Sequence, residues 1–242
     1  ETLALRFPSV MMLNNPEPLG FAANNNQVLR LARGRYTVLL NDDMVLANNA
    51  LDRMVGFMDE NASVGAIGCK LLNRDGTVQR SCWRGFPSAK TLLVDLFYLS
   101  KWLPHISLVK DFEATFQITE AAEVDYVLGA CLLVRREVIE QVGILDESFG
   151  MFLEETDWCF RIRAASWRIF WVPDGEILHY GQQSVSRDPS RYVPMLYQNY
   201  CTFGRKHGYH WRTIVLLKVI IALGMLFRAL VWSFRVVTGT PD

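Results

Sequence analysis

The sequence has few of the residues that build disulfide frameworks or structural zinc sites. Its five cysteines are an odd number and form no CxxC pair. We interpret them as small buried apolar residues in a reducing cytoplasm. Residue 1 is Glu, and no basic segment followed by an apolar stretch marks a secretory signal. We therefore expect the natural start to lie upstream of Glu1.

The sequence also lacks an excess of charge of either sign, with 25 Lys and Arg against 25 Asp and Glu. This balance argues against a dedicated nucleic-acid-binding protein. Half of the residues are hydrophobic and 21% are charged, for a mean hydropathy of +0.11. A chain of 242 residues with this composition can bury a large core. It is also apolar enough to favour contact with a membrane.

The apolar excess is concentrated in residues 214–237, where 19 of 24 residues are apolar. On a helix its three basic residues, Lys218, Arg228 and Arg235, fall within a stripe of roughly 100° that apolar residues share. Charges near the centre make spanning a bilayer costly, so we expect a basic helix that lies in the membrane interface. Spanning and docking into a partner's groove stay open. The predicted boundary separates residues 1–210 from residues 211–242.

The rest of the chain alternates between strand-like and helix-like patterns. Short apolar runs predict strands at residues 9–13, 36–40, 64–72 and 168–173. Residues 48–61 form an amphipathic helix pattern between two of these strands. The alternation favours an α/β layer with parallel strands. Residues 92–109 are apolar but interrupted by Pro104, which indicates a helix near an acceptor site or membrane face, or one packed in the core.

Asn41, Asp42 and Asp43 directly follow the predicted strand at 36–40. Ligands of open α/β sheets bind at the carboxyl ends of strands. Adjacent carboxylates at such an end suit Mg²⁺ or Mn²⁺, which prefer hard oxygen ligands. The alternative is that these residues cap the following helix.

A second group of acids, Glu154, Glu155 and Asp157, lies at a predicted loop-to-helix junction. Crowded carboxylates raise one another's pKa, and a carboxylate beside an apolar surface is suited to accept a proton. The alternative is ordinary capping of a helix N-terminus. His179 follows the last strand pattern, where a lone His is usually structural but can bind a metal.

Five motifs occur in an order that resembles glycosyltransferase family two, over roughly residues 9–210. They are NNPEPLGFAANNN, LLNDDM, VDYVLGACLLVRREV, GILDESFGMFLEETDWCFRIR and HYGQQS. The sequence is most similar to the branch that contains rhamnosyltransferases and galactofuranosyltransferases of bacterial cell-surface polysaccharides. The resemblance implies a GT-A-like, Rossmann-related mixed sheet flanked by helices. It also implies that the first strands of the family domain, which read the nucleotide base and ribose, are absent here.

The resemblance implies a role for each candidate residue. Asp43, as the last acid of the strand-end motif, and His179, 24 residues after Glu155, bind Mg²⁺ or Mn²⁺. Glu155, the second acid of its pair, acts as the base. Glu154 and Asp157 support it. Donor-binding positions fall on Asn15, Gly20, Asn26, Asn41 and Asp42.

The implied activity is inverting, metal-dependent transfer of a sugar from a nucleotide-diphosphate donor, such as dTDP-rhamnose or a UDP-sugar. The acceptor is a glycan or a lipid-linked molecule in cell-surface polysaccharide synthesis. We expect residues 214–237 to contact the membrane surface, at the cytoplasmic face of the cell membrane, and no nucleic acid to bind. The alternative is a non-catalytic, membrane-associated module that binds carbohydrate or acts as a scaffold.

Overall fold

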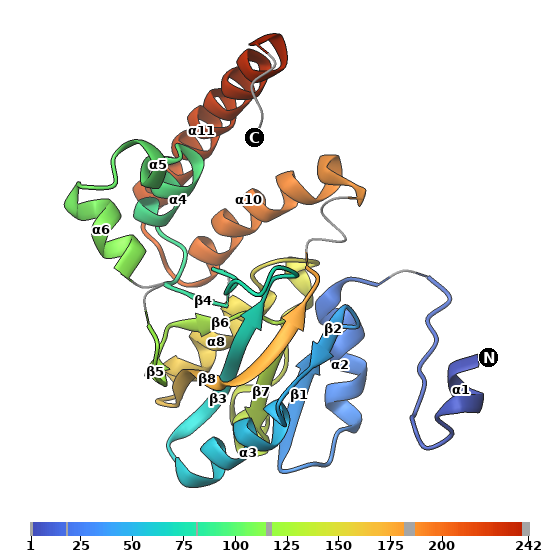
Figure 1. Cartoon of the computed structure of the whole chain (residues 1–242). Helices are drawn as coiled ribbons and strands as arrows, with labels where there is room; N and C mark the ends of the chain where they lie inside the picture. Colours follow the sequence, from blue (N-terminus) through green and yellow to red (C-terminus); the bar gives the residue numbers. More distant parts are fainter. Residues whose placement is uncertain (1, 18, 81, 115–117, 182–186, 239–242) are drawn as a thin grey trace.

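The computed structural model describes residues 2–17, 19–80, 82–114, 118–181 and 187–238. Its centre is a mixed sheet with the strand order β1-β7-β3-β8-β2, and β5 pairs with β8 beside this path (Figure 1). In chain order the strands of this sheet are β1 Tyr36–Leu40, β2 Met44–Leu46, β3 Val64–Leu72, β5 Ala122–Glu123, β7 Cys131–Arg135 and β8 Arg168–His179. A small second sheet pairs β4 (Trp83–Arg84) with β6 (Tyr126–Val127).

Helices surround the central sheet and project from it. They are α1 Thr2–Arg6, α2 Phe21–Leu31, α3 Ala50–Glu60, α4 Ala89–Leu96, α5 Leu99–Trp102, α6 Ser107–Ala114, α7 Arg136–Val142, α8 Glu154–Ala164, α10 Pro189–Lys206 and α11 Trp211–Thr238. A 3₁₀ turn covers Glu147–Phe149. The main core lies between the sheet, α3 and α8, where Met54, Met58, Ile67, Trp158 and Trp171 are buried.

Strand direction differs from the sequence-based expectation. Among the described strands only β3 and β8 run parallel, and the pairs β1–β7, β7–β3, β2–β8 and β5–β8 are antiparallel. Apolar runs predict where strands form, but the direction of each strand depends on the neighbour with which it pairs. The mixed sheet flanked by helices is confirmed, and the expectation of a parallel layer holds only for the pair β3–β8.

The strand predicted at residues 9–13 is wrong. The segment has no regular structure, and the side chains of Val10 and Met11 are exposed. An apolar run becomes a strand only when another strand supplies hydrogen-bond partners. No described strand lies beside this segment.

The C-terminal apolar helix is confirmed as α11, which packs against α4. A Cβ added to Gly224 would lie 2.7 Å from the Cβ of Leu96, so the two helices are in close contact. Arg228 donates to the carbonyls of Asp95 (2.7 Å) and Leu96 (3.2 Å) at the end of α4. Arg228 therefore stabilises a helix C-terminus instead of belonging to a free basic stripe. Residues 92–109 are split among α4, α5 and α6, and Leu92 and Leu96 pack with Leu217 and Ile220.

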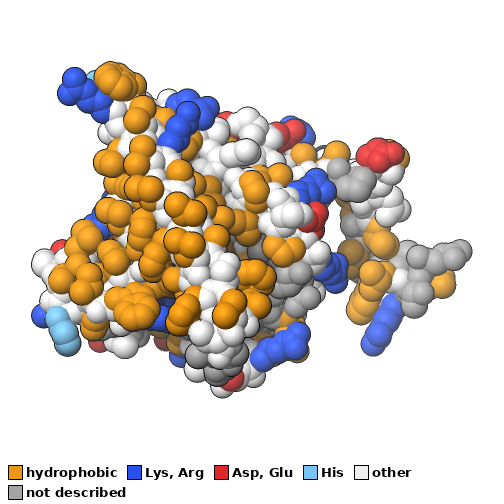
Figure 2. Space-filling view, turned by 90° about the horizontal axis from the view of Figure 1, so that it is seen from above, with side chains coloured by type: hydrophobic (Ala, Val, Ile, Leu, Met, Phe, Trp, Pro, Cys, Tyr) orange, Lys and Arg blue, Asp and Glu red, His pale blue; other side chains and the backbone are white. Residues whose placement is uncertain are grey.

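The outer part of α11 is exposed and strongly apolar. Helix α11 is long and apolar enough to cross a membrane, and 22% of its most apolar stretch is buried in the protein. Exposed apolar side chains include Val219, Leu223, Leu226, Leu230 and Phe234. Figure 2, which views the molecule from the side on which α11 projects, shows hydrophobic side chains gathered in a broad patch.

Candidate active site

The predicted metal ligands meet where β2 pairs with the end of β8. The chain leaves β1 at Leu40, passes through residues 41–43 and enters β2. Strand β2 pairs antiparallel with β8 in a register that sets Met44 opposite His179. The N–H of Tyr180 also donates to the carbonyl of Asp43, at 3.0 Å. This pairing brings Asp43 beside His179, although the two residues are far apart in the sequence.

The side chains of Asp43 and His179 face each other, with 3.4 Å between Oδ1 and Nε2. Gln79 fixes the ring of His179 from the other side. Its Nε2 donates to the carbonyl of His179 at 2.7 Å, and its Oε1 lies 2.8 Å from the ring Nδ1. Because the amide nitrogen of Gln79 donates to the carbonyl of His179, the amide oxygen of Gln79 is the atom that faces Nδ1. This oxygen can only accept, so the ring proton lies on Nδ1. The lone pair of Nε2 therefore points to Asp43.

The electrostatics of this pair favour a bound cation. Burial lowers the pKa of His179, and the neighbouring Asp43 only partly opposes this shift. The ring is therefore neutral near pH 7. Asp43 Oδ1 is buried and has no hydrogen-bond partner. A neutral imidazole nitrogen and an unpartnered carboxylate oxygen are both electron-pair donors, and a metal ion satisfies both.

The remaining coordination positions would belong to other molecules. Among the residues that the structure describes, no three His, Cys, Asp or Glu side chains form a group that could hold a metal ion. Two protein ligands suit Mg²⁺ or Mn²⁺, which usually keep water and phosphate oxygens in their coordination shell. The residues present therefore fit a divalent ion shared with a phosphorylated ligand.

The acid pair Glu154 and Glu155 begins α8, directly after a strained loop. Phe152 and Leu153 both have positive φ angles, 72° and 67°, which side-chain-bearing residues seldom adopt. Asn199 of α10 holds this loop, since its Nδ2 lies 2.7–3.0 Å from the carbonyl oxygens of Phe149, Met151 and Phe152. Backbone strain supported by neighbouring contacts is typical of functional sites.

Burial changes the protonation of both glutamates. It raises the pKa of Glu154, and the charge of Glu155 raises it further. Burial also raises the pKa of Glu155, but backbone hydrogen bonds of Thr156 and Gly129 oppose this shift. Glu154 Oε2 has no hydrogen-bond partner. The pKa of each carboxyl group is therefore above the ordinary value of 4.5, and the backbone hydrogen bonds favour the ionised form of Glu155.

The turn between β6 and β7 connects the two halves of the site. The carbonyl of Ala130 accepts from the N–H of Asn41 at 2.9 Å, which fixes the exit of β1. A Cβ added to Gly129 would lie 3.2 Å from Cβ of Glu155 and 3.4 Å from Cζ of Phe21. The turn thus packs against the acid pair on one side and against the metal-ligand segment on the other.

Comparison with known proteins identifies the family. The family described as "Glycosyltransferase like family 2" matches residues 2–193, more than half of the chain. The chain belongs to this family. It is 25% identical over 224 residues to N-acetylglucosaminyl-diphospho-decaprenol L-rhamnosyltransferase of Mycobacterium tuberculosis, covering 86% of this chain and 71% of the relative. It is 24% identical over 170 residues to rhamnosyltransferase WbbL of Escherichia coli, covering 66% of this chain and 61% of that protein.

A solved structure shares the fold of this glycosyltransferase. GalNAc-T7, crystallised with UDP, GalNAc and Mn²⁺, superposes with a TM-score of 0.52 over 74% of this chain, at 16% identity. The match spans 34% of the GalNAc-T7 chain. Together with the mixed sheet, it confirms the GT-A-like fold class.

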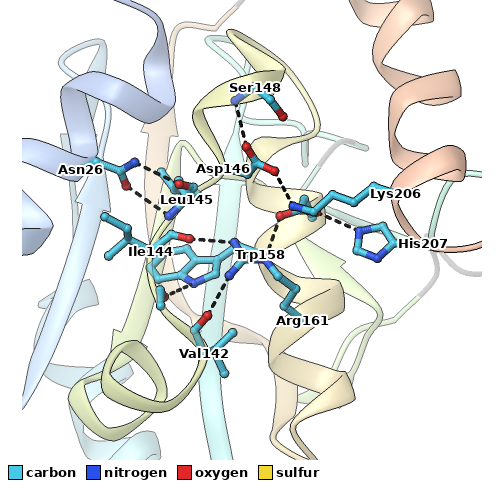
Figure 3. Close-up of polar contacts among 12 residues, drawn as sticks. Asn26, Val142, Ile144, Leu145, Asp146, Ser148, Trp158, Arg161, Lys206 and His207 are labelled. Atoms are coloured by element: carbon cyan, nitrogen blue, oxygen red, sulfur yellow. Dashed lines mark hydrogen bonds and ion pairs between the residues drawn. The ribbon is translucent and has the colours of Figure 1, made fainter.

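Asp157 of the glycosyltransferase lies in an ion-pair network behind the acid pair. Its side chain is fully buried and contacts Arg161 (2.9 Å), Lys206 (2.7 Å) and His207 (2.8 Å). Arg161 also donates to the carbonyls of Val142 and Ile144, as Figure 3 shows. These contacts join α8 to the end of α10 and to the loop before the 3₁₀ turn. We therefore assign Asp157 a positioning role.

Asn26 is part of the same scaffold (Figure 3). It is 1% exposed. Its Nδ2 donates to the carbonyl of Leu145 (2.9 Å) and to Glu147 (2.8 Å), and its Oδ1 accepts from the N–H of Leu145 (3.1 Å). Both amide hydrogens are used inside the protein. The structure thus places Asn26 between α2 and residues 145–147, and its contact with a donor stays a prediction.

The other donor-binding candidates of the glycosyltransferase lie on the surface around this scaffold. Gly20 begins α2, and a Cβ there would lie 2.4 Å from the carbonyl oxygen of Gly150, so its small size serves contact with that loop. Asn15 is exposed and bonded to Asn24 and Gln27. Asp42 is exposed and Asn41 is half-buried. Their contacts with a donor stay predictions.

Several site residues were not identified from the sequence. Gln79, Asn199 and Lys206 carry no motif signal of their own, because each acts on a partner distant in the chain. Gly129 lies within the motif VDYVLGACLLV, but its contact with Glu155 depends on the fold.

Proposed function

We propose that this glycosyltransferase transfers a sugar from a nucleotide-diphosphate donor to an acceptor hydroxyl, in a metal-dependent reaction that inverts the anomeric carbon. The observation that carries the proposal is the unpartnered Asp43 Oδ1 facing neutral His179, at a site that the 128–131 turn links to the buried Glu155. Asp43 and His179 fit a metal ion that binds a diphosphate, and Glu155 fits a base.

Glu155 is the proposed base. Direct displacement needs a base that removes the proton of the attacking hydroxyl. The raised pKa of Glu155 makes its carboxylate a stronger proton acceptor than an exposed glutamate. Backbone hydrogen bonds of Thr156 and Gly129 favour its ionised form. Glu154 stays protonated beside it and avoids a second buried negative charge.

Asp43 and His179 are the proposed ligands of Mg²⁺ or Mn²⁺. The ion would neutralise charge on the diphosphate as it leaves. Gln79 holds the ring of His179 with its Nε2 lone pair toward the site. The pairing of β2 with β8 fixes the distance between the ligands before any ligand binds.

The names of the relatives suggest substrates for the proposed reaction. The Mycobacterium tuberculosis relative is named for rhamnose transfer to N-acetylglucosaminyl-diphospho-decaprenol, and that of Escherichia coli for rhamnose transfer. We therefore propose dTDP-rhamnose or a UDP-sugar as donor, and a glycan or lipid-linked acceptor in cell-surface polysaccharide synthesis. Residues 1–210 form the proposed catalytic domain. Residues 211–242 form its membrane contact at the cytoplasmic face, which the exposed apolar surface of α11 supports.

The decisive experiment compares wild type, Glu155→Gln and Glu140→Gln. Nucleotide sugars are screened with a lipid-linked acceptor, with and without Mn²⁺, and product stereochemistry is determined. Glu155→Gln is expected to abolish transfer while Mn²⁺ binding and folding remain. Glu140, exposed on α7, is the matched control and should leave turnover unchanged. Retained turnover in Glu155→Gln refutes the base assignment, and full activity in chelator refutes the metal assignment. Binding of donor or glycan with no turnover under any condition would favour the non-catalytic module.

A further inference from the structure

Helices α10 and α11 enclose a groove remote from the proposed metal ligands. The two helices diverge from the short connection at residues 207–210 (Figure 1). The space between them has a volume of about 720 Å³, the size of a small-molecule site. Its walls include Tyr197, Cys201 and Arg205 of α10 and Lys218, Ile221 and Met225 of α11.

Two cations face this groove without acidic partners. Arg205 and Lys218 are exposed, and neither forms an ion pair with any residue that the structure describes. Burial raises the pKa of Cys201, and the charges of Arg205 and Lys218 both oppose this shift. Both cations and Cys201 line the same groove. By contrast, the adjacent Lys206 is paired with Asp146 and Asp157.

Most of the surface that continues from the groove along α11 is apolar. Ile221, Ala222 and Met225 line the groove beyond Lys218, and Trp232 and Val236, which share their side of the helix, are exposed further along it. Figure 2 shows a broad hydrophobic patch on the side of the molecule from which α11 projects. A ligand that matches this surface has an anionic head and a hydrocarbon chain. A soluble anion would leave the apolar wall in water.

We propose that the groove between α10 and α11 binds an anionic membrane phospholipid, with its phosphate between Arg205 and Lys218 and its acyl chain along α11. Charge complementarity and the continuous apolar wall carry this assignment. The site lies outside the catalytic residues and goes beyond the proposed sugar transfer. The same helix α10 also holds the loop before Glu154, through the hydrogen bonds of Asn199.

The experiment titrates the full chain in neutral detergent micelles with phosphatidylglycerol, phosphatidylcholine or inorganic phosphate, followed by calorimetry. Micelles allow the same measurement whether α11 spans or lies on a membrane. The variants are Arg205→Gln, Lys218→Gln and the double variant. The matched control is Arg212→Gln, because Arg212 is exposed on the first turn of α11 and does not line the groove. Thermal unfolding checks that all variants fold.

Saturable binding of phosphatidylglycerol is expected, with Kd raised about tenfold in Arg205→Gln and in Lys218→Gln, as for one charge-assisted contact. Arg212→Gln should stay within about twofold of wild type, because diffuse attraction alone would weaken binding equally for every removed charge. The double variant should lose less than the product of the two single effects, because both cations contact one phosphate.

Three results would overturn the proposal. One is equal loss in Arg212→Gln and the groove variants. Another is equal affinity for phosphatidylcholine, and the third is equal affinity for inorganic phosphate, which would indicate a site for soluble anions. Sugar transfer does not enter these measurements, so failure of this proposal and failure of the proposed function are distinguishable.

Discussion

Replacing Gln79 by Leu tests whether the ring of His179 is prepared for a metal. The substitution introduces an apolar side chain of similar size and removes two contacts with His179. These are the hydrogen bond to its carbonyl at 2.7 Å and the contact of its ring Nδ1 at 2.8 Å. The ring then loses the acceptor that fixes the proton on Nδ1, and Nε2 no longer presents its lone pair to Asp43.

The structure sets the expected size of the loss in stability and of the loss in metal affinity. Gln79 is 9% exposed and His179 is 7% exposed, so water replaces the lost contacts poorly. Leaving a buried N–H and a buried carbonyl unpaired costs about 1–3 kcal/mol each, which predicts a loss of roughly 2–6 kcal/mol in unfolding free energy. Removing the partner that orients a metal-binding His typically weakens metal affinity by about 10–100-fold.

Mn²⁺ titration, followed by the electron paramagnetic resonance of the free ion, measures the second effect without any sugar donor. Gln79→Glu restores an acceptor for Nδ1 and should recover most of the Mn²⁺ affinity, although the carbonyl of His179 stays unpaired. Gln141→Leu is the matched control, because Gln141 accepts from the Trp167 ring on the exposed surface (2.8 Å) and should leave Mn²⁺ affinity unchanged. If Gln79→Leu binds Mn²⁺ as wild type does while His179→Ala does not, the orienting role is refuted. If His179→Ala also binds normally, the metal site itself is refuted.

Three further predictions concern the base and its scaffold. The rate of transfer should rise with pH on an acidic limb above the ordinary glutamate range, because burial raises the pKa of Glu155 and only its carboxylate accepts a proton. Glu154→Gln should leave this limb at the same pH. If the limb disappeared in Glu154→Gln, Glu154 would be the base. Gly129→Ala should lower kcat while the melting temperature changes little, because the new Cβ lies 3.2 Å from Cβ of Glu155. A kcat equal to that of wild type would place the base elsewhere. Asn26→Ala should cost roughly 3 kcal/mol in denaturant unfolding while donor KM stays unchanged, because it removes three hydrogen bonds of a buried side chain. A raised KM with unchanged stability would instead indicate a donor contact.

The pattern of the sequence was sufficient to predict several strands and helices and to select the candidate site residues. The apolar runs at 36–40 and 64–72 correspond to β1 and β3 residue for residue, although β3 is a buried central strand and β1 is a partly exposed edge strand. The order of the five motifs identified the family and pointed to Asp43, Glu155 and His179. These signals are local, so they can be read along the chain without knowing the fold.

Tertiary structure decided which polar side chains are free for a ligand. Asn26 and Asp157 have the same motif signal as the proposed site residues, yet their polar atoms are satisfied inside the protein. Asp43 Oδ1 is buried and unpartnered, and Gln79, with no motif signal, turns His179 toward it. The sequence determined which elements form and which residues are candidates. Only the fold decided their roles, because the state of a buried polar group depends on partners that other strands and helices bring to it.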